Sequence, residues 1–510
     1  MTHNKPFRAA LVILYIACSF LPASVQLLGQ ADSGSGRSCK VRKDADGMRH
    51  LLPDCWYRAA AGIKVVTFKK KLTYGYELSL DPALLSTQLD EIKNEGFSAI
   101  EIFAPADGGT AYNGLDTKNY YRIDPELGSM DDFRRAVRLA HSKHLAAIIF
   151  INLGYLSVEA PDWIQAENDK KAGIQSSLVS RFLWSDKPDA PPPSTQEDVY
   201  ITPAQRERDK AYWGWHYSDA AASYYWSRWK ADGSGGSVVP LPQMNWGDPD
   251  WRQEAERIAR FWMDIGIDGM VIDAPLCYPN QTWSENLQSI TSIVASYGNT
   301  LVDPEGGRNT TAWITEAGYN TMHEYYAKFA QAIESGNPNQ IESSLNGMRD
   351  SIMEQGGVLY GRFLSDNFIN DPMKHHLQQA LMVGVGDVVV YTREHKEQRG
   401  PDNDEATNLK LKAIHPALFP TATRTKLATN ADDKYYAILK TAQEGSERMV
   451  AVYNFQPTVQ SVQLFLGVVD TPGIVDAQSA VIIPRPNEFD PIVIELPAYV
   501  YRFFTVVPRK

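Results

Sequence analysis

Short apolar runs alternate with amphipathic segments along most of the chain. Apolar runs at residues 63–68, 97–103 and 146–153 are separated by segments 84–95 and 131–143, which carry apolar residues at helical spacing. Continuous apolar runs are typical of strands that are buried on both faces, as in a parallel sheet covered by helices. Strands that alternate with helices in this way predict an α/β fold.

The same alternation resumes in the second half of the chain. Helical spacing recurs at residues 250–265 and 284–297, and strand-like runs recur at residues 270–272, 300–302 and 383–391. We therefore expect the parallel sheet and its helical cover to continue to this point.

Residues 156–240 interrupt the alternation. They contain Pro191-Pro192-Pro193 and a dense cluster of ring-bearing side chains. The cluster consists of Tyr212, Trp213, Trp215, His216, Tyr217, Tyr224, Tyr225, Trp226 and Trp229. We expect an irregular insertion after the third strand, whose aromatic residues either form a platform for sugar rings or pack together as a small subdomain.

The pattern of apolar and polar residues changes near residue 427. From there on, short strand-like segments are separated by turns. These segments are residues 435–439, 449–455, 462–466, 480–483 and 492–496. The pattern is typical of an antiparallel β-sandwich, and we assign this domain to residues 425–510.

The bulk composition is that of a globular protein with more than one domain. At 510 residues, the chain is too long for a single core. Its formal net charge of −11 argues against nucleic acid as a partner, because there is no basic excess to displace counterions. Nothing in the pattern indicates a cofactor or a particular oligomeric state.

Residues 1–31 have the layout of a secretion signal. Two basic residues precede an apolar run at residues 9–20, which is too short to span a bilayer stably. The pair Ala17-Cys18 leaves a lipoprotein processing site as a secondary interpretation. No later segment predicts a transmembrane helix, so we expect a secreted or periplasmic protein.

Four cysteines are spread along the chain. Export would permit disulfides. If Cys18 leaves with the signal, Cys39 and Cys55 are the expected pair, within a linker or loop segment at residues 32–60. Cys277 would then stay free. The cysteines are too scattered for a zinc site, and no metal is expected.

One stretch places a carboxylate directly after a buried strand. Asp268 and Gly269 supply turn chemistry, and the apolar residues 270–272 form the strand. Asp273 follows where that strand ends. A carboxylate at the carboxyl end of a parallel barrel strand is placed for catalysis rather than for stability.

This stretch resembles the nucleophile motif of the α-amylase family of glycoside hydrolases, Gly-x-Asp-Gly-Phe-Arg-x-Asp. The last Asp of the motif attacks the sugar and corresponds to Asp273. The glycines and Asp268 also match, whereas Val271 stands at the position of the family's Arg. The resemblance implies a (β/α)8 TIM barrel over residues 61–424, with the insertion included.

A second run resembles the family's Tyr-His-Gly-Tyr segment and the strand that closes in Asp-x-x-x-Asn-His. Here Asn113 stands for the first His, Leu115 for a stacking Tyr and Phe150 for the strand Asp. Gly154-Tyr155 stands for Asn-His. Loss of that Asn removes a usual calcium ligand, so no calcium is expected there.

Two shorter segments extend the resemblance. Residues 241–246 resemble the family's Met-Pro-x-Leu-Asn, which implies that Asn245 binds substrate, as Asn113 and Tyr155 would. Residues 361–368 resemble the seventh-strand motif Phe-Leu-x-Asn-His-Asp.

In that seventh-strand segment, Asp366-Asn367-Phe368 replaces Asn-His-Asp. Asp366 either supplies a third carboxylate from a bulged strand end or has a structural role. Asn367 would contact substrate.

The proton donor has two candidates. Glu305 ends the first strand after the helix that follows Asp273, a spacing that suits one strand–helix unit. Glu316 also follows a short apolar run, but residues 319–326 look like the family's sixth strand, which puts Glu316 in a connecting loop. We prefer Glu305 and keep Glu316 as the alternative.

These residues imply an exported retaining glycoside hydrolase or transglycosidase that acts on an oligosaccharide or α-glycoside. Asp273 would attack the sugar, and Glu305 would serve as acid and base. Because Val271 and the other replacements alter the family's pocket, the alternative is a catalytically inactive barrel that binds carbohydrate or a protein partner.

Overall fold

The computed structural model describes most of the chain. The described residues are 38–68, 75–109, 114–195, 211–232, 238–279, 283–305, 312–324, 327–345, 352, 357–362, 374–391, 405–467 and 471–508. The expected signal peptide lies outside them. Within the described ranges, no helix combines the length and the apolar character that crossing a membrane requires.

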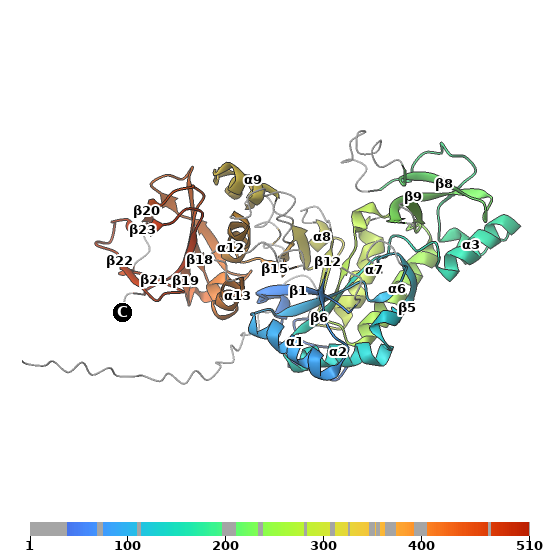
Figure 1. Ribbon diagram of the computed structural model, residues 1–510, viewed down its shortest axis with the longest axis horizontal. Coiled ribbons are helices and arrows are strands. Elements are labelled where there is room, and N and C mark those ends of the chain that lie inside the picture. The colour runs from blue at the N-terminus through green and yellow to red at the C-terminus, as the bar shows by residue number, and fades with distance from the viewer. Residues whose placement is uncertain are drawn as a thin grey trace, which may run out of the picture.

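Eight parallel strands form the central sheet (Figure 1), in the order β12-β11-β6-β3-β1-β15-β14-β13, with the short β2 (Tyr76–Glu77) beside β1. They are β1 (Gly62–Thr67), β3 (Ala99–Phe103), β6 (Ala146–Ile151), β11 (Gly269–Ile272), β12 (Leu301–Pro304), β13 (Thr321–Glu324), β14 (Val358–Arg362) and β15 (Val388–Tyr391). The first strand pairs with the last, β1 with β15, and chain order is kept on either side of that pair. This is the strand order of a (β/α)8 barrel, and it confirms the predicted parallel sheet.

β12 and β13 are the two ends of this order, and Asn320 links them. The amide of Val302 donates to Asn320 Oδ1 (2.8 Å), and Asn320 Nδ2 donates to the Thr300 carbonyl (2.8 Å). The Thr321 hydroxyl adds a hydrogen bond to the Val302 carbonyl (3.1 Å). Hydrogen bonds from side chains therefore hold these two strands next to each other.

Both faces of the sheet are apolar, because successive strand residues point to opposite sides. We call the inner face the one that carries Ile63, Val65, Ala99, Phe103, Ile148, Phe150, Val271, Val388 and Val390, which belong to one buried cluster. The outer face carries Val66, Ile100, Ile102, Ile149, Ile151, Met270 and Ile272, which pack with residues of the helices. The continuous apolar runs of the sequence reflect this double burial.

Helices pack on the outer face (Figure 1). They include α1 (Pro82–Asn94), α2 (Met130–Ser142), α6 (Pro249–Ile265), α7 (Trp283–Ser296), α9 (Ala327–Ser335), α10 (Asn339–Ser344), α12 (His375–Val385) and α13 (Glu405–Ile414). The strand predicted over residues 383–391 is wrong at its start, because residues 383–385 end α12 and Gly386, at φ 94°, stops the helix before β15. An apolar run alone does not distinguish a buried helix end from a buried strand.

The insertion was expected to be irregular, and in its described part this is wrong. It contains α3 (Pro161–Ala172), α4 (Ser177–Ser180) and a four-stranded antiparallel sheet of β7 (Trp184–Ser185), β8 (Gly214–Ser218), β9 (Ser223–Asp232) and β10 (Val238–Pro242). Aromatic residues form cross-strand pairs, Trp215 with Trp226 and Tyr217 with Tyr224, with ring centroids 5.3 and 5.1 Å apart. Such pairs stabilise a hairpin. His216 pairs with Tyr225 on the opposite face, so ring-bearing side chains occupy both faces and hide the alternation that usually marks a strand.

The C-terminal domain consists of two antiparallel sheets around one apolar cluster, which confirms the predicted antiparallel architecture. The larger sheet has the order β16 (Thr423–Lys426), β18 (Tyr435–Thr441), β19 (Arg448–Asn454), β24 (Tyr501–Val506), β21 (Gly473–Asp476) and β22 (Ile482–Pro484). The smaller has β17 (Ala428–Thr429), β20 (Gln460–Phe465) and β23 (Ile492–Leu496). β24 was not predicted, although it lies between β19 and β21. α12 lies against this domain, where the Tyr453 hydroxyl donates to the Ala380 carbonyl (3.0 Å).

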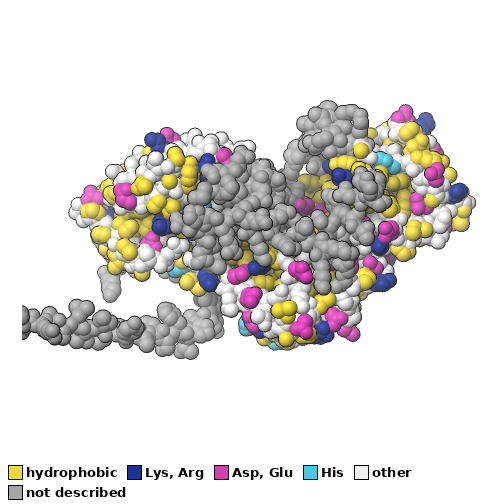
Figure 2. Space-filling model, in the orientation of Figure 1, with side chains coloured by type: hydrophobic (Ala, Val, Ile, Leu, Met, Phe, Trp, Pro, Cys, Tyr) yellow, Lys and Arg dark blue, Asp and Glu magenta, His cyan; other side chains and the backbone are white. Residues whose placement is uncertain are grey.

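Surface charge is mixed on the face drawn in Figure 2. The described Lys and Arg side chains are interspersed there with Asp and Glu side chains. A surface of this kind gives no single-sign field to steer a charged ligand over that face.

The segment ahead of β1 is built into the fold. Cys39 and Cys55 form a disulfide, which confirms the predicted pair, and Cys277 is free and buried. Trp56, in the short helix η2 (Trp56–Arg58), donates its indole N–H to the Asn299 carbonyl (3.1 Å), just before β12. A segment expected to be a linker or loop therefore packs against the amino-terminal ends of the strands.

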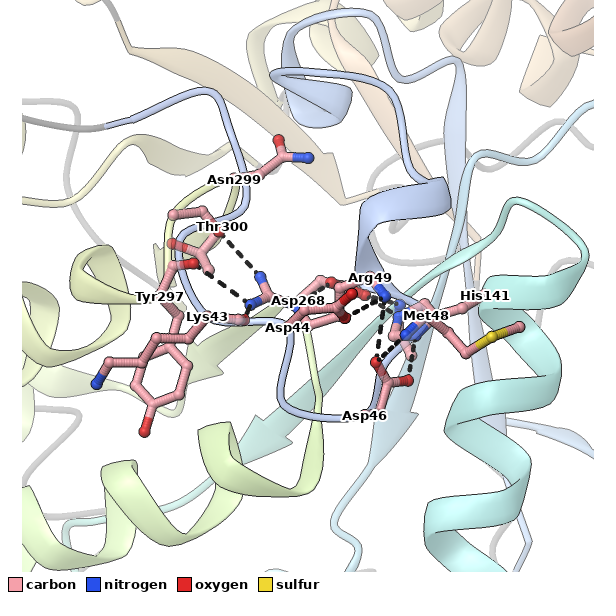
Figure 3. A network of polar contacts seen from close by, with 12 residues as sticks. Lys43, Asp44, Asp46, Met48, Arg49, His141, Asp268, Tyr297, Asn299 and Thr300 are labelled. Carbon is pink, nitrogen blue, oxygen red and sulfur yellow. Dashed lines mark hydrogen bonds and ion pairs between the residues drawn. The ribbon is translucent and has the colours of Figure 1, made fainter.

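A buried ion network joins this segment to the sheet, and Figure 3 shows its side chains gathered around Asp268. Arg49 Nε lies 2.9 Å from Asp268 Oδ1, and His141 Nε2 lies 2.6 Å from Asp268 Oδ2. His141 Nδ1 lies 2.5 Å from Asp46. Burial lowers the pKa of His141, but the two carboxylates outweigh it and raise that pKa to about 10. His141 is therefore a cation at neutral pH, and Asp268 lies between two cations.

Candidate active site

Asp273 stands directly after β11, at the carboxyl end of the central sheet. Its amide donates to the Ile151 carbonyl (2.9 Å), which continues the pairing of β11 with β6. Asp273 belongs to the inner face, two residues beyond Val271, and is 8% exposed. Its carboxylate is thus held at the mouth of the inner face and largely shielded from solvent.

Glu305 holds the equivalent position on the neighbouring strand. β11 and β12 pair with Ile272 opposite Pro304, so Asp273 and Glu305 are the next residues on the two strands. The Glu305 amide donates to the Ile272 carbonyl (2.9 Å), and Glu305 Oε2 accepts a hydrogen bond from the amide of Ala274 (3.3 Å). The two acids are neighbours across strand ends that are about 4.8 Å apart.

Ala274 makes the turn that brings its amide to Glu305. Its φ of 37° and ψ of 52° lie in the left-handed region, which a residue with a Cβ rarely adopts. The short helix η6 (Pro275–Cys277) follows at once. Backbone strain of this kind is concentrated at functional sites, where surrounding contacts hold it in place.

The hydroxyl of Tyr155 contacts the Asp273 side chain. It donates to Asp273 Oδ2 at 3.2 Å. Asn152, just after β6, fixes the turn that carries Tyr155: its Oδ1 accepts from the Gly154 amide (2.7 Å), and its Nδ2 donates to the Tyr155 carbonyl (2.7 Å). Tyr155 is 1% exposed, so the hydroxyl meets the carboxylate in a buried setting.

A second tyrosine holds the Asp273 backbone. The Tyr278 hydroxyl donates to the Asp273 carbonyl (2.8 Å) and accepts from the Leu153 amide (3.3 Å). Its ring is stacked on Trp246, with centroids 4.7 Å apart. No motif in the sequence marks Tyr278, and its contact with Leu153 depends on a loop distant in the chain.

A family model described as the catalytic domain of alpha amylase matches residues 83–342, slightly more than half of the chain. The chain belongs to the alpha-amylase family. The matched range includes Asp273, Glu305 and Tyr155 and ends before Asp366.

Several relatives in the alpha-amylase family match a part of the chain. Alpha-amylase 3 of Dictyoglomus thermophilum is 26% identical over 191 residues, which cover 37% of this chain and 31% of that protein. Probable oligo-1,6-glucosidase 2 of Bacillus subtilis is 28% identical over 187 residues, 37% of this chain and 29% of that protein. Trehalose synthase/amylase TreS of Mycolicibacterium smegmatis is 25% identical over 226 residues, 44% and 35% respectively. These matches span about a third of the length of the relatives.

Solved structures match nearly the whole of this family member. Isomaltulose synthase from Erwinia rhapontici has a TM-score of 0.66 at 15% identity, and the match covers 89% of this chain and 99% of that chain. Alpha-amylase from H. orenii has a TM-score of 0.65 at 13% identity, covering 87% and 99%. At these identities the likeness concerns the fold alone.

The inner face below Asp273 departs from the alpha-amylase family pattern at two positions together. Val271 and Phe150, which stand for the family's Arg and Asp, are direct partners across β11 and β6. Both are buried in one apolar cluster, where Phe150 packs on Phe103 with ring centroids 4.9 Å apart. With an apolar residue at each of these two positions, neither position places an unpaired charge in the interior.

The remaining predicted site residues have other surroundings. Glu316 is exposed, after α8 (Ala312–Thr315) and before β13. Asn245 donates its side-chain amide to the Ser180 carbonyl (3.2 Å) and accepts from the Gly247 amide (3.1 Å), which ties it to the loop before α6. No cluster of three or more His, Cys, Asp or Glu side chains suited to a metal ion occurs in the part of the chain that the structure describes. Three predicted residues lie outside that part: Asn113, Asp366 and Asn367.

A buried carboxyl lies close to the Tyr155 turn in the chain segment before β5. Asp116, just before β5 (Thr117–Ile123), is 2% exposed, and its Oδ1 has no hydrogen-bond partner within the described ranges. Burial raises the pKa of Asp116 to about 7, although hydrogen bonds from its own amide and from Ser157 act in the opposite sense.

We expect Asp116→Asn to raise the melting temperature at about pH 8 and to leave it unchanged near pH 4. An acid whose pKa is higher in the folded than in the unfolded chain costs no stability below the unfolded pKa of about 3.9. The cost grows as pH rises toward the folded pKa of about 7 and is constant above it. Thermal unfolding at the two pH values measures the difference, and an equal change at both would contradict this account.

Proposed function

We propose that this alpha-amylase family member is a retaining glycoside hydrolase or transglycosidase, with Asp273 as nucleophile and Glu305 as acid and base. The proposal rests on two carboxylates that follow adjacent paired strands. Glu305 Oε2 accepts a hydrogen bond from the amide of Ala274, the residue after Asp273. Retaining enzymes need two carboxyl groups about 5–5.5 Å apart. Residues at the ends of neighbouring strands, about 4.8 Å apart, can meet that requirement.

The reaction takes two steps. In the first, an Asp273 oxygen attacks the anomeric carbon while the bond to the leaving group breaks, and Glu305 gives its proton to the leaving oxygen. In the second, the Glu305 carboxylate takes a proton from water or from an acceptor hydroxyl, whose oxygen displaces Asp273 from the sugar. Water as the acceptor gives hydrolysis, and a sugar hydroxyl gives transfer.

The substrate proposed is an oligosaccharide or other α-glycoside, as the names of the relatives suggest. Asp366 is proposed as a third carboxylate that binds sugar hydroxyls, with Asn113, Asn245 and Asn367 as further contacts. We also propose that the mature chain is exported. The basic and apolar layout of residues 1–31 supports export, and so does the disulfide, since disulfides persist in oxidising compartments.

We expect Glu305→Gln to lower kcat by about 10²–10⁴-fold on an unactivated α-glycoside, because the proton donor is lost. Glu316→Gln is the matched control, since Glu316 is exposed, and it should keep wild-type kcat. Steady-state assays on a panel of α-glycosides give both values. Azide should accelerate Glu305→Ala on an aryl glycoside, because a small anion can displace Asp273 without a base. If Glu316→Gln loses activity and Glu305→Gln does not, the acid and base is Glu316.

The alternative function is a barrel that binds carbohydrate without turnover. The apolar pair Val271 and Phe150 favours it, because the family's cation beside the nucleophile is absent at that position. This alternative predicts that oligosaccharides raise the melting temperature with no product formed. Turnover that depends on Asp273 excludes it.

A further inference from the structure

The position that carries an arginine in the family motif offers Asp273 no donor. Val271 is fully buried and packs in the apolar cluster of the inner face with Phe150. A carboxylate that must stay ionised in a shielded site depends on hydrogen bonds to its charged form, which lower its pKa. Some other group has to supply that hydrogen bond.

Tyr155 supplies it from the turn after β6. Its hydroxyl donates to Asp273 Oδ2 (3.2 Å), and the turn is fixed by both side-chain atoms of Asn152. Asn152 Nδ2 also donates to the Leu115 carbonyl (3.1 Å), which anchors the turn to the neighbouring hairpin. The hydroxyl is therefore directed at the carboxylate by a rigid support.

The insertion completes that support. The Tyr155 ring packs against Trp229 of β9, with centroids 5.5 Å apart. The backbone of Tyr155 bridges to Gln243, and the Met244 amide donates to the Gly154 carbonyl (2.8 Å). Contacts from β9 and from the residues after β10 thus help to hold the turn.

We propose that Tyr155 is a positioning residue that orients the Asp273 carboxylate and keeps it ionised, in the role that the arginine has in the family motif. The inference rests on the proposed function, in which Asp273 is the nucleophile, and it replaces the expectation that Tyr155 binds substrate. Because the hydroxyl stabilises the charged form of the carboxylate, its removal should make Asp273 take up a proton at a higher pH.

Other groups lie near Asp273 on the described elements next to it. β12 contributes Glu305 and, opposite Val271 in register, Asp303. Tyr278, after η6, and Tyr120, on β5, also lie close enough to interact with the charge. Burial raises the pKa of both tyrosines, and the charge of Asp273 adds to the effect. Both stay protonated while Asp273 titrates, so among these described residues Glu305 and Asp303 are the acids that bear on its titration.

The test titrates the Asp273 carboxyl directly. Protein labelled with ¹³C at the aspartate side-chain carboxyls is titrated by NMR, and the Asp273 signal is assigned as the one absent from Asp273→Asn. We expect Tyr155→Phe to raise the pKa of Asp273 by about one, which is tenfold in the protonation equilibrium. Incorporating 3-fluorotyrosine at position 155, whose hydroxyl is a stronger donor of similar size, should lower that pKa.

The matched control is Tyr453→Phe. Tyr453 is also fully buried, and its hydroxyl donates a hydrogen bond to the Ala380 carbonyl in the C-terminal half of the chain. This variant should leave the titration of Asp273 unchanged. An Asp273 pKa that is equal in wild type and Tyr155→Phe would overturn the inference, whether or not the protein turns over a sugar.

Activity gives a separate readout. If the wild type hydrolyses an α-glycoside, the acid limb of its kcat/KM profile should move up by about one pH unit in Tyr155→Phe and should not move in Tyr453→Phe. A protein without turnover contradicts the proposed function but leaves the NMR test intact. A changed rate with an unmoved acid limb would mean that Tyr155 has only a structural role.

Discussion

Asp268→Asn is expected to lower the free energy of unfolding by about 3–5 kcal/mol, because it leaves two buried cations without their shared counter-charge. Asp268, Arg49 and the His141 side chain are fully buried, and the carboxylate lies within 2.9 Å of both cations. Asn keeps the shape of the side chain, so the loss reports charge rather than packing. Chemical denaturation near neutral pH, where His141 is protonated, measures it.

Asp248→Asn is the matched control for this substitution. Asp248 caps α6 by accepting from the Trp251 amide (2.8 Å), and Asn caps a helix about as well as Asp. Its free energy of unfolding should stay within about 0.5 kcal/mol of wild type. Adding Arg49→Met to Asp268→Asn should recover part of the loss, because one unpaired cation is removed. Equal stability of Asp268→Asn and Asp248→Asn would show that the network contributes nothing.

The ion network around Asp268 also predicts that the free energy of unfolding depends on pH in the alkaline range. The pKa of His141 is about 10 in the folded chain, above the unfolded value of about 6.5. The stability that His141 contributes is therefore complete below about pH 6.5 and is lost as pH rises toward 10.

Asp273→Asn is expected to lower turnover on the order of 10⁴-fold or more, because no covalent intermediate can form without the nucleophile. The variant should fold normally, since an amide can still accept the Tyr155 hydrogen bond. Asp264→Asn, an exposed position near the end of α6, is the matched control and should keep full activity. Melting temperatures and steady-state rates of the two variants separate folding from chemistry. Activity of Asp273→Asn close to wild type would remove Asp273 from the mechanism.

Local pattern was enough to locate the strand ends on which the site depends. The apolar residues 270–272 followed by Asp273, and the shorter run before Glu305, predicted β11 and β12 because strands buried on both faces leave a continuous apolar signal. The pairing of Cys39 with Cys55 was also predictable, since the other cysteines are remote in the chain.

Contacts between distant segments were not predictable from that pattern. Arg49 and His141 meet Asp268 only after the chain has folded, so residues 32–60 were predicted to be a linker or loop segment. Tyr155 was assigned to substrate by its position in a motif, whereas its contact with Asp273 depends on β9 and on residues after β10. Such roles follow from register and packing, which a single sequence does not encode locally.

The most direct test of the two-carboxylate site is covalent labelling with a 2-deoxy-2-fluoroglycosyl fluoride, followed by mass mapping of the peptides. The 2-fluorine slows both steps, and the fluoride leaving group keeps the first step the faster of the two, so the glycosyl-enzyme intermediate accumulates. The account predicts a single sugar adduct on Asp273, which is absent in Asp273→Asn and formed at a reduced rate in Tyr155→Phe. An adduct on any other residue of a protein that turns over α-glycosides would contradict it.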